Sequence, residues 1–83
     1  MTRDQIGERI ANALATVLGH RQFELNDSLV ASDVEGWDSL THMSIITAVE
    51  KEFSVRFKLK EINKLKDMGS LIDLVEGKMN APA

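Results

Sequence analysis

The sequence predicts an all-α protein, a four-helix bundle of three longer helices and one short helix. Residues 4–18, 39–53 and 68–79 place apolar residues at steps of three and four, the spacing that gives a helix one buried face. Only residues 53–57 show the alternation of a strand, and only briefly. Hydrophobic residues make up 43% of the 83 residues, which is enough apolar material for one small core. We therefore expect a single domain over residues 1–83.

Residues 4–18 form the first expected helix, and a glycine ends it. The apolar stripe of this helix consists of Ile6, Ile10, Ala13, Leu14 and Val17. Gly19 follows directly and can adopt the left-handed conformation that commonly terminates a helix.

Residues 19–37 show no regular period and are rich in Asn, Asp, Ser and Gly. A connection of this length in a small domain is usually functional. Apolar residues are spread along it, at Phe23, Leu25, Leu29, Val34 and Trp37. We therefore expect an ordered connection that is attached to the core at several points, with Gly36 permitting a tight turn beside the anchoring Trp37.

Residues 39–53 form the second expected helix, and Asp38 is well suited to cap its first turn. Placed at the angular step of a helix, the residues of the buried stripe are Ile46, Val49 and Phe53. The residues beside this stripe are His42, Met43 and Ile45. Leu40 falls among the polar residues and is expected to be exposed, whereas Met43 lies at the margin of the stripe.

The last part of the chain predicts one short and one longer helix. Residues 59–65 form the short helix, with apolar residues at Leu59, Ile62 and Leu65. Phe57 precedes it and is expected to pack inward. Residues 68–79 form the last helix, whose apolar side carries Met68, Leu71, Ile72, Val75 and Met79. Either Asp67 or Ser70 caps this helix, and Asp67 is favoured.

Composition and charge exclude several classes of protein. The chain has no cysteine, so it forms no disulfide or thiolate metal site, and thiol chemistry needs an added cofactor. No stretch has the length of a membrane span, and the N-terminus lacks an apolar signal segment; we expect a cytoplasmic monomer. Residues 24–52 carry seven acidic side chains against one lysine, which disfavours nucleic acid as a ligand. Residues 80–83 are expected to form a frayed tail.

Asp-Ser-Leu occurs twice, and only the second copy precedes a helical pattern. The copy at residues 38–40 places the Ser39 hydroxyl at the first turn of a helix, where backbone N–H groups are free and the helix dipole is positive. A phosphate esterified to Ser39 would be stabilised there. An ordinary helix cap explains the same residues equally well. We interpret the copy at residues 27–29 as a turn.

A hydrolase is a further hypothesis, because Asp38, Ser39 and His42 lie close together in the sequence. Ser39 and His42 are three residues apart and could touch on a helix. However, the sequence has no Gly-x-Ser-x-Gly elbow, and no second oxyanion donor is evident. His42 lies on the apolar side, where a partly buried imidazole is the more common outcome. His20 and His42 lack further ligands at a suitable spacing, so we expect no metal site.

A basic segment follows the second expected helix. Its cations are Arg56, Lys58, Lys60, Lys64 and Lys66. Such a run is usually a solvated face, and we favour that interpretation. The alternative is a second docking surface that favours acidic partners.

Residues 33–40 combine an acidic residue, a glycine and Asp-Ser-Leu, and the helix that follows ends in acidic residues and Phe53. In this pattern, and in helix order, residues 3–79 resemble the acyl carrier protein family. The resemblance implies that Ser39, with Asp38 beside it, holds 4'-phosphopantetheine. A phosphopantetheinyl transferase moves this arm from coenzyme A with the help of Mg²⁺, and the thiol of the arm then carries acyl groups as thioesters.

The same resemblance implies which residues meet acyl groups and other proteins. The residues that would contact acyl-activating and acyl-transferring enzymes are Leu40, Met43 and Glu50. The residues that would line the core where an acyl chain enters are Ile46, Val49 and Phe53. The protein would then be a carrier and not an enzyme, in fatty acid, polyketide or related biosynthesis.

The chain also departs from the family's usual pattern. The second helix is uncharged where many carriers of fatty acid synthesis are acidic, at Thr41, His42, Ser44 and Thr47. Trp37 replaces a small residue. These departures suggest a specialised carrier for a polyketide, a surface polysaccharide or another secondary pathway. Two alternatives stay open: a carrier of amino acids or peptides, whose serine often follows Gly-Gly, and an unmodified helical adaptor that binds a partner through Leu40 and Met43.

Overall fold

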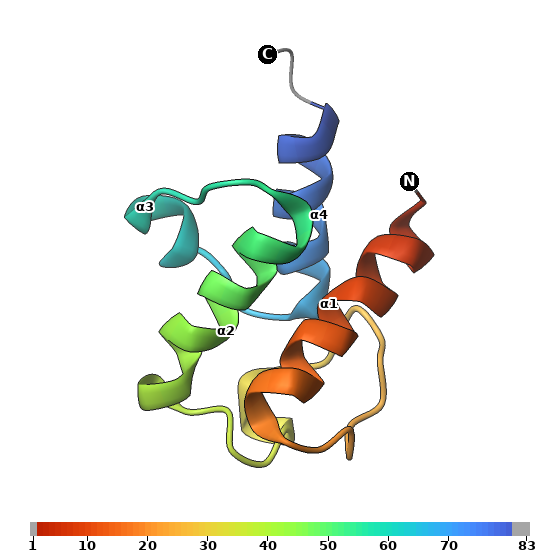
Figure 1. The fold of residues 1–83 in the computed structure, drawn as a ribbon, viewed down its shortest axis with the longest axis vertical. Helices are drawn as coiled ribbons and strands as arrows, with labels where there is room; N and C mark the ends of the chain where they lie inside the picture. The colour runs from red at the N-terminus through yellow and green to blue at the C-terminus, as the bar shows by residue number, and fades with distance from the viewer. Residues whose placement is uncertain (1, 81–83) are drawn as a thin grey trace.

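The computed structural model describes residues 2–80, and this range forms four α-helices and one short 3-10 helix (Figure 1). The elements are α1 (Arg3–Leu18), η1 (Ala31–Asp33), α2 (Ser39–Phe53), α3 (Leu59–Ile62) and α4 (Met68–Asn80). No β-strand occurs among the described residues. The prediction of an all-α fold with three longer helices and one short helix is therefore confirmed.

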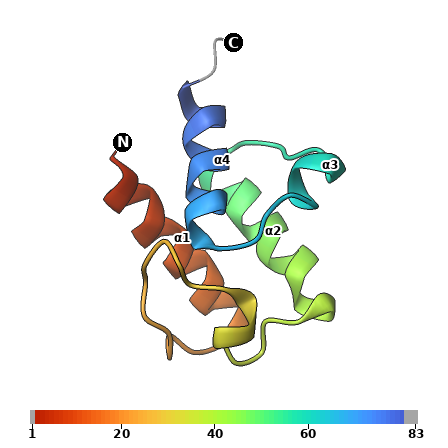
Figure 2. The same cartoon turned by 180° about the vertical axis from the view of Figure 1, so that it is seen from behind.

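The first helix begins and ends at the residues that its sequence favours. The Thr2 hydroxyl accepts a hydrogen bond from the Gln5 N–H (3.2 Å), and the Gln5 side chain accepts one from the Thr2 N–H (2.9 Å), which is reciprocal capping. Gly19 ends α1 with a φ of 78°, as expected for a terminating glycine. α1 packs against both α2 and α4 (Figures 1 and 2), so it holds the bundle together.

The core consists of the expected apolar stripes, and no polar side chain is buried within residues 2–79. Its largest fully buried side chains are Ile6, Ile10, Leu14, Ile45, Ile46, Met68, Val49 and Val75. Each contributes about 1.5–3 kcal/mol by leaving water. Phe57 packs inward as expected. Met79 does not, because the end of α4 projects beyond the other helices (Figures 1 and 2), and its side chain is 41% exposed.

The connection between α1 and α2 is ordered and is fixed to the start of α4. The Leu29 carbonyl accepts a hydrogen bond from the Met68 N–H (2.8 Å), and the Asp27 carbonyl accepts one from the Gly69 N–H (2.9 Å). A Cβ atom on Gly69 would lie 3.1 Å from the Asp27 carbonyl oxygen, so this close approach requires glycine. A segment with little regular structure is thus attached to the bundle through its backbone.

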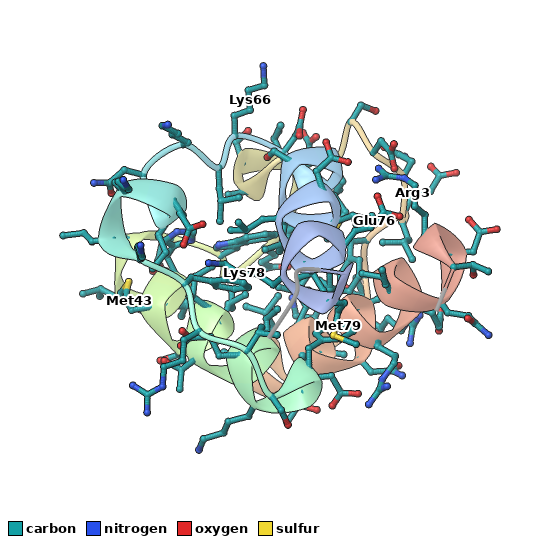
Figure 3. The ribbon with its side chains drawn as sticks, turned by 90° about the horizontal axis from the view of Figure 1, so that it is seen from above. Arg3, Met43, Lys66, Glu76, Lys78 and Met79 are labelled. Atoms are coloured by element: carbon teal, nitrogen blue, oxygen red, sulfur yellow. The ribbon has the colours of Figure 1, made fainter. Side chains whose placement is uncertain are left out.

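One arginine links three segments at the surface. Arg3 of α1 forms ion pairs with Asp27 of the connection and with Asp73 and Glu76 of α4. Figure 3 shows Arg3 and Glu76 close together at one edge of the molecule. These side chains are partly exposed, so each pair adds little stability alone, but together they fix the connection between α1 and α4.

The short helix α3 ends earlier than the expected range of residues 59–65. After Ile62 the chain turns, because the Lys64 N–H binds the Glu61 carbonyl (3.2 Å) and the Leu65 N–H binds the Ile62 carbonyl (3.1 Å). This three-residue spacing is that of a tight turn. The turn packs Leu65 against the core and redirects the chain toward α4.

The start of α4 uses both candidate capping residues. Asp67 Oδ1 accepts a hydrogen bond from the Ser70 N–H (2.8 Å), and the Ser70 hydroxyl accepts one from the Asp67 N–H (3.1 Å). The preference for Asp67 as the cap is therefore confirmed, with Ser70 completing the pair. At the other end, Asn80 still belongs to α4, whereas residues 81–83 of the expected tail lie outside the described range.

Leu14→Ala should lower the free energy of unfolding by about 2–5 kcal/mol, because it leaves a cavity in the core. Leu40 is 87% exposed, so Leu40→Ala removes the same atoms from the surface and should change that free energy by less than about 0.5 kcal/mol. Urea unfolding followed by circular dichroism measures both. Similar losses in the two variants would contradict this assignment of core and surface.

Stability should also depend on Glu61. The Lys58 backbone N–H, and then the Lys78 ammonium group, hold the pKa of the Glu61 carboxyl below its usual value of 4.5. Such a carboxylate stabilises the folded state above the unfolded pKa and loses this effect as the pH falls. Glu61→Gln should therefore destabilise the protein at pH 7 and progressively less between about pH 5 and pH 3. Urea unfolding over this pH range measures the loss, with Glu24→Gln at an exposed position as the control. A loss of stability that does not change with pH would contradict the role of Glu61.

Candidate functional site

The start of α2 is fixed by a closed set of hydrogen bonds. Asp38 Oδ1 accepts from the Leu40 N–H (2.9 Å) and the Thr41 N–H (3.1 Å), and the Thr41 hydroxyl accepts from the Asp38 N–H (2.9 Å). The same hydroxyl donates to the Gly36 carbonyl (2.6 Å), so the cap also holds the end of the connection. Gly36 has a φ of 88°, which glycine adopts without strain. The prediction that Asp38 caps α2 is confirmed.

Ser39 is the first residue of α2, and it is exposed to solvent. The N–H groups of the next three residues all bind Asp38. Those of Leu40 and Thr41 bind its carboxylate, and that of His42 binds its backbone carbonyl oxygen (2.9 Å). Neither the N–H group nor the hydroxyl of Ser39 has a hydrogen-bond partner within residues 2–80. The start of α2 therefore presents one free hydroxyl and one free N–H group on a rigid backbone.

Trp37 and His42 form a stacked pair beside Ser39. Their ring centroids lie 6.2 Å apart with an angle of 19° between the planes, and Trp37 Nε1–H donates to His42 Nδ1 (3.1 Å). Because an indole N–H can only donate, His42 Nδ1 is the acceptor of this bond. The pair lines a shallow depression together with Ala31, Asp38 and Ser39, which leaves open space around the serine.

This pairing removes the base that the hydrolase hypothesis requires. His42 Nδ1 is engaged by Trp37, and within residues 2–79 no hydrogen bond joins His42 to Ser39, so the contact between nucleophile and base that a triad requires is not formed. The Asp38 carboxylate binds the backbone of α2 and orients no imidazole. The site can present the Ser39 hydroxyl to another molecule, but it contains nothing that activates it.

The first Asp-Ser-Leu copy is built differently. Asp27 and Ser28 lie in a turn, closed by a hydrogen bond from the Leu29 N–H to the Asn26 carbonyl (3.2 Å). The Ser28 hydroxyl donates to Asn26 Oδ1 (2.7 Å), so it is already engaged. The prediction of a turn is confirmed, and this serine has no helix behind it.

The residues expected to meet other proteins fall into two groups. Leu40 and Met43 are 87% and 50% exposed, which agrees with their expected positions at the surface and at the margin of the stripe. Glu50 is half-buried, and its Oε2 accepts a hydrogen bond from the Phe57 N–H (2.8 Å). The Glu50 carboxylate thus holds the loop that follows α2, a structural contact that its position in the sequence did not indicate.

Within residues 2–80, no three His, Cys, Asp or Glu side chains approach one another closely enough to hold a metal ion. None of the helices in this part of the chain combines the length and the hydropathy that crossing a membrane demands.

The contact between Trp37 and His42 predicts energetic coupling between the two rings. Trp37→Phe removes the N–H donor and His42→Phe removes the acceptor, whereas each keeps an aromatic ring. We expect a coupling of about 0.5–1.5 kcal/mol between the two substitutions in the free energy of unfolding, measured by urea unfolding of both single variants and the double variant. Purely additive effects would show that the hydrogen bond does not form in solution.

The chain matches known proteins along most of its length. Residues 8–75 match the family model described as phosphopantetheine attachment site. An acyl carrier protein of Exiguobacterium sibiricum is 29% identical to this chain, over 92% of this chain and 96% of its own length. An acyl carrier protein of Petrotoga mobilis is 27% identical, over 96% of this chain and 94% of its own length. The non-reducing polyketide synthase pkdA of Emericella nidulans is 32% identical over 88% of this chain, which corresponds to 3% of the synthase. No solved structure matches the chain.

The family match, the relatives of the same length and the all-helical fold agree with one another. They also agree with the resemblance that the sequence itself carries. The chain therefore belongs to the acyl carrier proteins of the phosphopantetheine attachment family, whose cofactor is a covalently bound 4'-phosphopantetheine.

Proposed function

We propose that Ser39 is the attachment point of the phosphopantetheine arm, and that the protein carries acyl intermediates as thioesters to partner enzymes. One observation supports this most: Ser39 offers an exposed, unengaged hydroxyl at the capped start of α2. The depression beside it, lined by Trp37 and His42, leaves space for a substituent. The residues present therefore fit the group that the family carries.

The backbone favours a phosphate ester at this position. The N-terminus of α2 carries the positive end of the helix dipole, which stabilises an anion. The free N–H of Ser39 is the one donor in the first turn that Asp38 does not occupy. Ser28 has neither advantage, because it lies in a turn and its hydroxyl binds Asn26. These differences support Ser39 over Ser28 as the modified residue.

The chain contributes position, and the arm contributes chemistry. Because the protein has no cysteine, the thiol that forms the thioester is supplied by the bound phosphopantetheine. Ser39 anchors the arm on the rigid first turn of α2, and tethering raises the local concentration of the substrate at a docked enzyme. Among residues 2–79 no side chain is hydrogen-bonded to the Ser39 hydroxyl, which supports loading by a separate phosphopantetheinyl transferase from coenzyme A with Mg²⁺.

The partner surface that we propose begins at the exposed apolar residues of α2. Leu40 and Met43 lie next to Ser39 and provide contact area for enzymes that load or receive the acyl group. Glu50 contributes to recognition by holding the loop after α2 in place rather than by a free charge, since its carboxylate binds Phe57.

The names of the relatives support a pathway of acyl chemistry. Two relatives are named acyl carrier proteins and one is named a polyketide synthase. The uncharged front of α2 and Trp37 depart from the pattern that the resemblance implies for general carriers of fatty acid synthesis, which supports a specialised role. We propose a cytoplasmic, monomeric carrier that serves a specialised pathway of polyketide or related acyl biosynthesis.

Ser39→Ala should abolish loading without changing the fold. Incubated with coenzyme A, Mg²⁺ and a promiscuous phosphopantetheinyl transferase, the unaltered protein should gain the mass of one phosphopantetheine, and Ser39→Ala should gain none. Intact-mass spectrometry measures the gain, and urea unfolding should show that the free energy of unfolding changes by less than about 0.5 kcal/mol.

Ser28→Ala is the matched control, because it removes the same hydroxyl from the other Asp-Ser-Leu copy. It should load like the unaltered protein. Loading of Ser39→Ala would refute the assignment of the site. If the unaltered protein gains no mass, the unmodified adaptor becomes the better hypothesis.

A further inference from the structure

The cations of this protein are divided into paired and unpaired groups by their position in the fold. The sequence has ten lysines and arginines. Four of them form ion pairs with carboxylates: Arg3, Arg9, Arg21 and Lys78. Of the other six, five lie between residues 56 and 66, and none of these five is paired with a carboxylate of residues 2–80.

These five unpaired cations form what we call the basic face. It consists of Arg56, Lys58, Lys60, Lys64 and Lys66, all of them exposed. The face begins in the loop after α2, includes α3 and ends just before α4. Figure 3 shows Lys66 extending away from the molecule into solvent. Like charges at this spacing repel one another, so the fold gains nothing from gathering them.

Glu61, the one acidic residue within this segment, attracts Lys58 of the face but also pairs with a cation of α4. Glu61 Oε1 accepts a hydrogen bond from the Lys58 N–H (2.8 Å) and lies 2.9 Å from Nζ of Lys78 in α4. Its charge is therefore directed toward the backbone of α3 and toward α4. The protein as a whole carries a net charge of -3, so the positive potential at α3 is a local exception.

An exposed leucine lies within the basic face. Leu59 is the first residue of α3 and its side chain is 67% exposed, whereas Ile62 of the same short helix is buried. Leu59 lies between Lys58 and Lys60 in the sequence, and an exposed apolar side chain with charged neighbours is typical of a protein–protein contact with a polar rim. Figure 3 also shows Met43 extending from α2 on the side of the molecule where α3 lies, so the two elements share a face.

The part of α2 that adjoins this face adds no negative charge. From Ser39 to Val49, α2 contains no Asp or Glu. Glu50 comes next, and its carboxylate binds the Phe57 N–H. A partner that lies across α2 and α3 therefore meets uncharged residues on α2 and cations on α3, and a basic partner surface would be repelled there.

We propose that the basic face docks an acidic surface of a partner enzyme, with Leu59 entering an apolar site between the acidic residues. The proposal rests on the carrier function proposed above, because docking is what brings the arm to an active site. Charge complementarity selects an acidic protein over other ligands. The acidic residues before α2 repel nucleic acid, and one leucine on a four-residue helix offers too little apolar surface for a membrane.

Acylation in the native cell tests this proposal. Lys60→Gln with Lys64→Gln removes two charges and should lower the fraction of the loaded carrier that bears an acyl group at least about fivefold, because rim charges control the rate of association. Intact-mass spectrometry of the recovered carrier measures this fraction. Lys60→Arg with Lys64→Arg keeps the charges and should acylate normally.

The control has the same net charge as the Gln variant. Thr16→Glu with Gln22→Glu also shifts the net charge by two negative units, at exposed positions far along the chain from α3, and should acylate normally. If the Gln variant and this control lose acylation equally, the proposal is overturned in favour of a general charge effect. If neither variant loses acylation, the proposal is overturned outright. The proposed attachment of the arm is tested separately, since every variant should still gain one phosphopantetheine in vitro.

A carbodiimide cross-link identifies the chemistry of the partner. This reagent joins a lysine amine to a carboxylate in direct contact, so peptide mass spectrometry should find Lys60 or Lys64 joined to Asp or Glu of a second protein. Products that join these lysines only to another copy of this chain would contradict a partner enzyme. Co-sedimentation with phosphatidylserine vesicles that is lost in the Gln variant would instead assign the face to a membrane.

Discussion

The capped start of α2 is the constraint on which the rest of the site depends. Asp38 holds two backbone N–H groups of the first turn, and Thr41 ties that turn to the Gly36 carbonyl. The position of Ser39 is therefore set by its neighbours' main-chain hydrogen bonds and not by any contact of its own side chain. Its hydroxyl can stay free for modification because nothing in the fold needs it.

This constraint is supported from a distant part of the chain. The connection between α1 and α2 has little regular structure, yet its backbone binds the first turn of α4 at two carbonyl groups. Val34, near its end, is buried in the core. The connection that leads to α2 is thus attached to the start of α4 and to the core, which explains why a long segment without a long helix is ordered. Loops of this kind position functional groups that a rigid scaffold supports.

The sequence alone predicted the features that local chemistry decides. The predicted bounds of α2 agree with the structure, because its capping residue and its buried stripe are both set by neighbouring residues in the sequence. The end of α3 could not be predicted, because it depends on the path that the chain must take to α4. The bond between Trp37 and His42 requires the fold of the connection to bring an indole onto the next helix. The contact of Glu50 with Phe57 depends in the same way on the left-handed Ser54 between them.

Charge is segregated along the chain on the two sides of α2, and this has a consequence for docking. Acidic residues lie just before α2, at Asp33, Glu35 and Asp38, whereas the basic face surrounds α3. A surface with one sign of charge attracts a partner without fixing its rotation about Ser39. A surface with opposite signs at two places fixes that rotation, because a partner turned the wrong way brings like charges together. The arm that we propose at Ser39 needs a fixed orientation, since a flexible tether reaches an active site only when the carrier docks in one orientation.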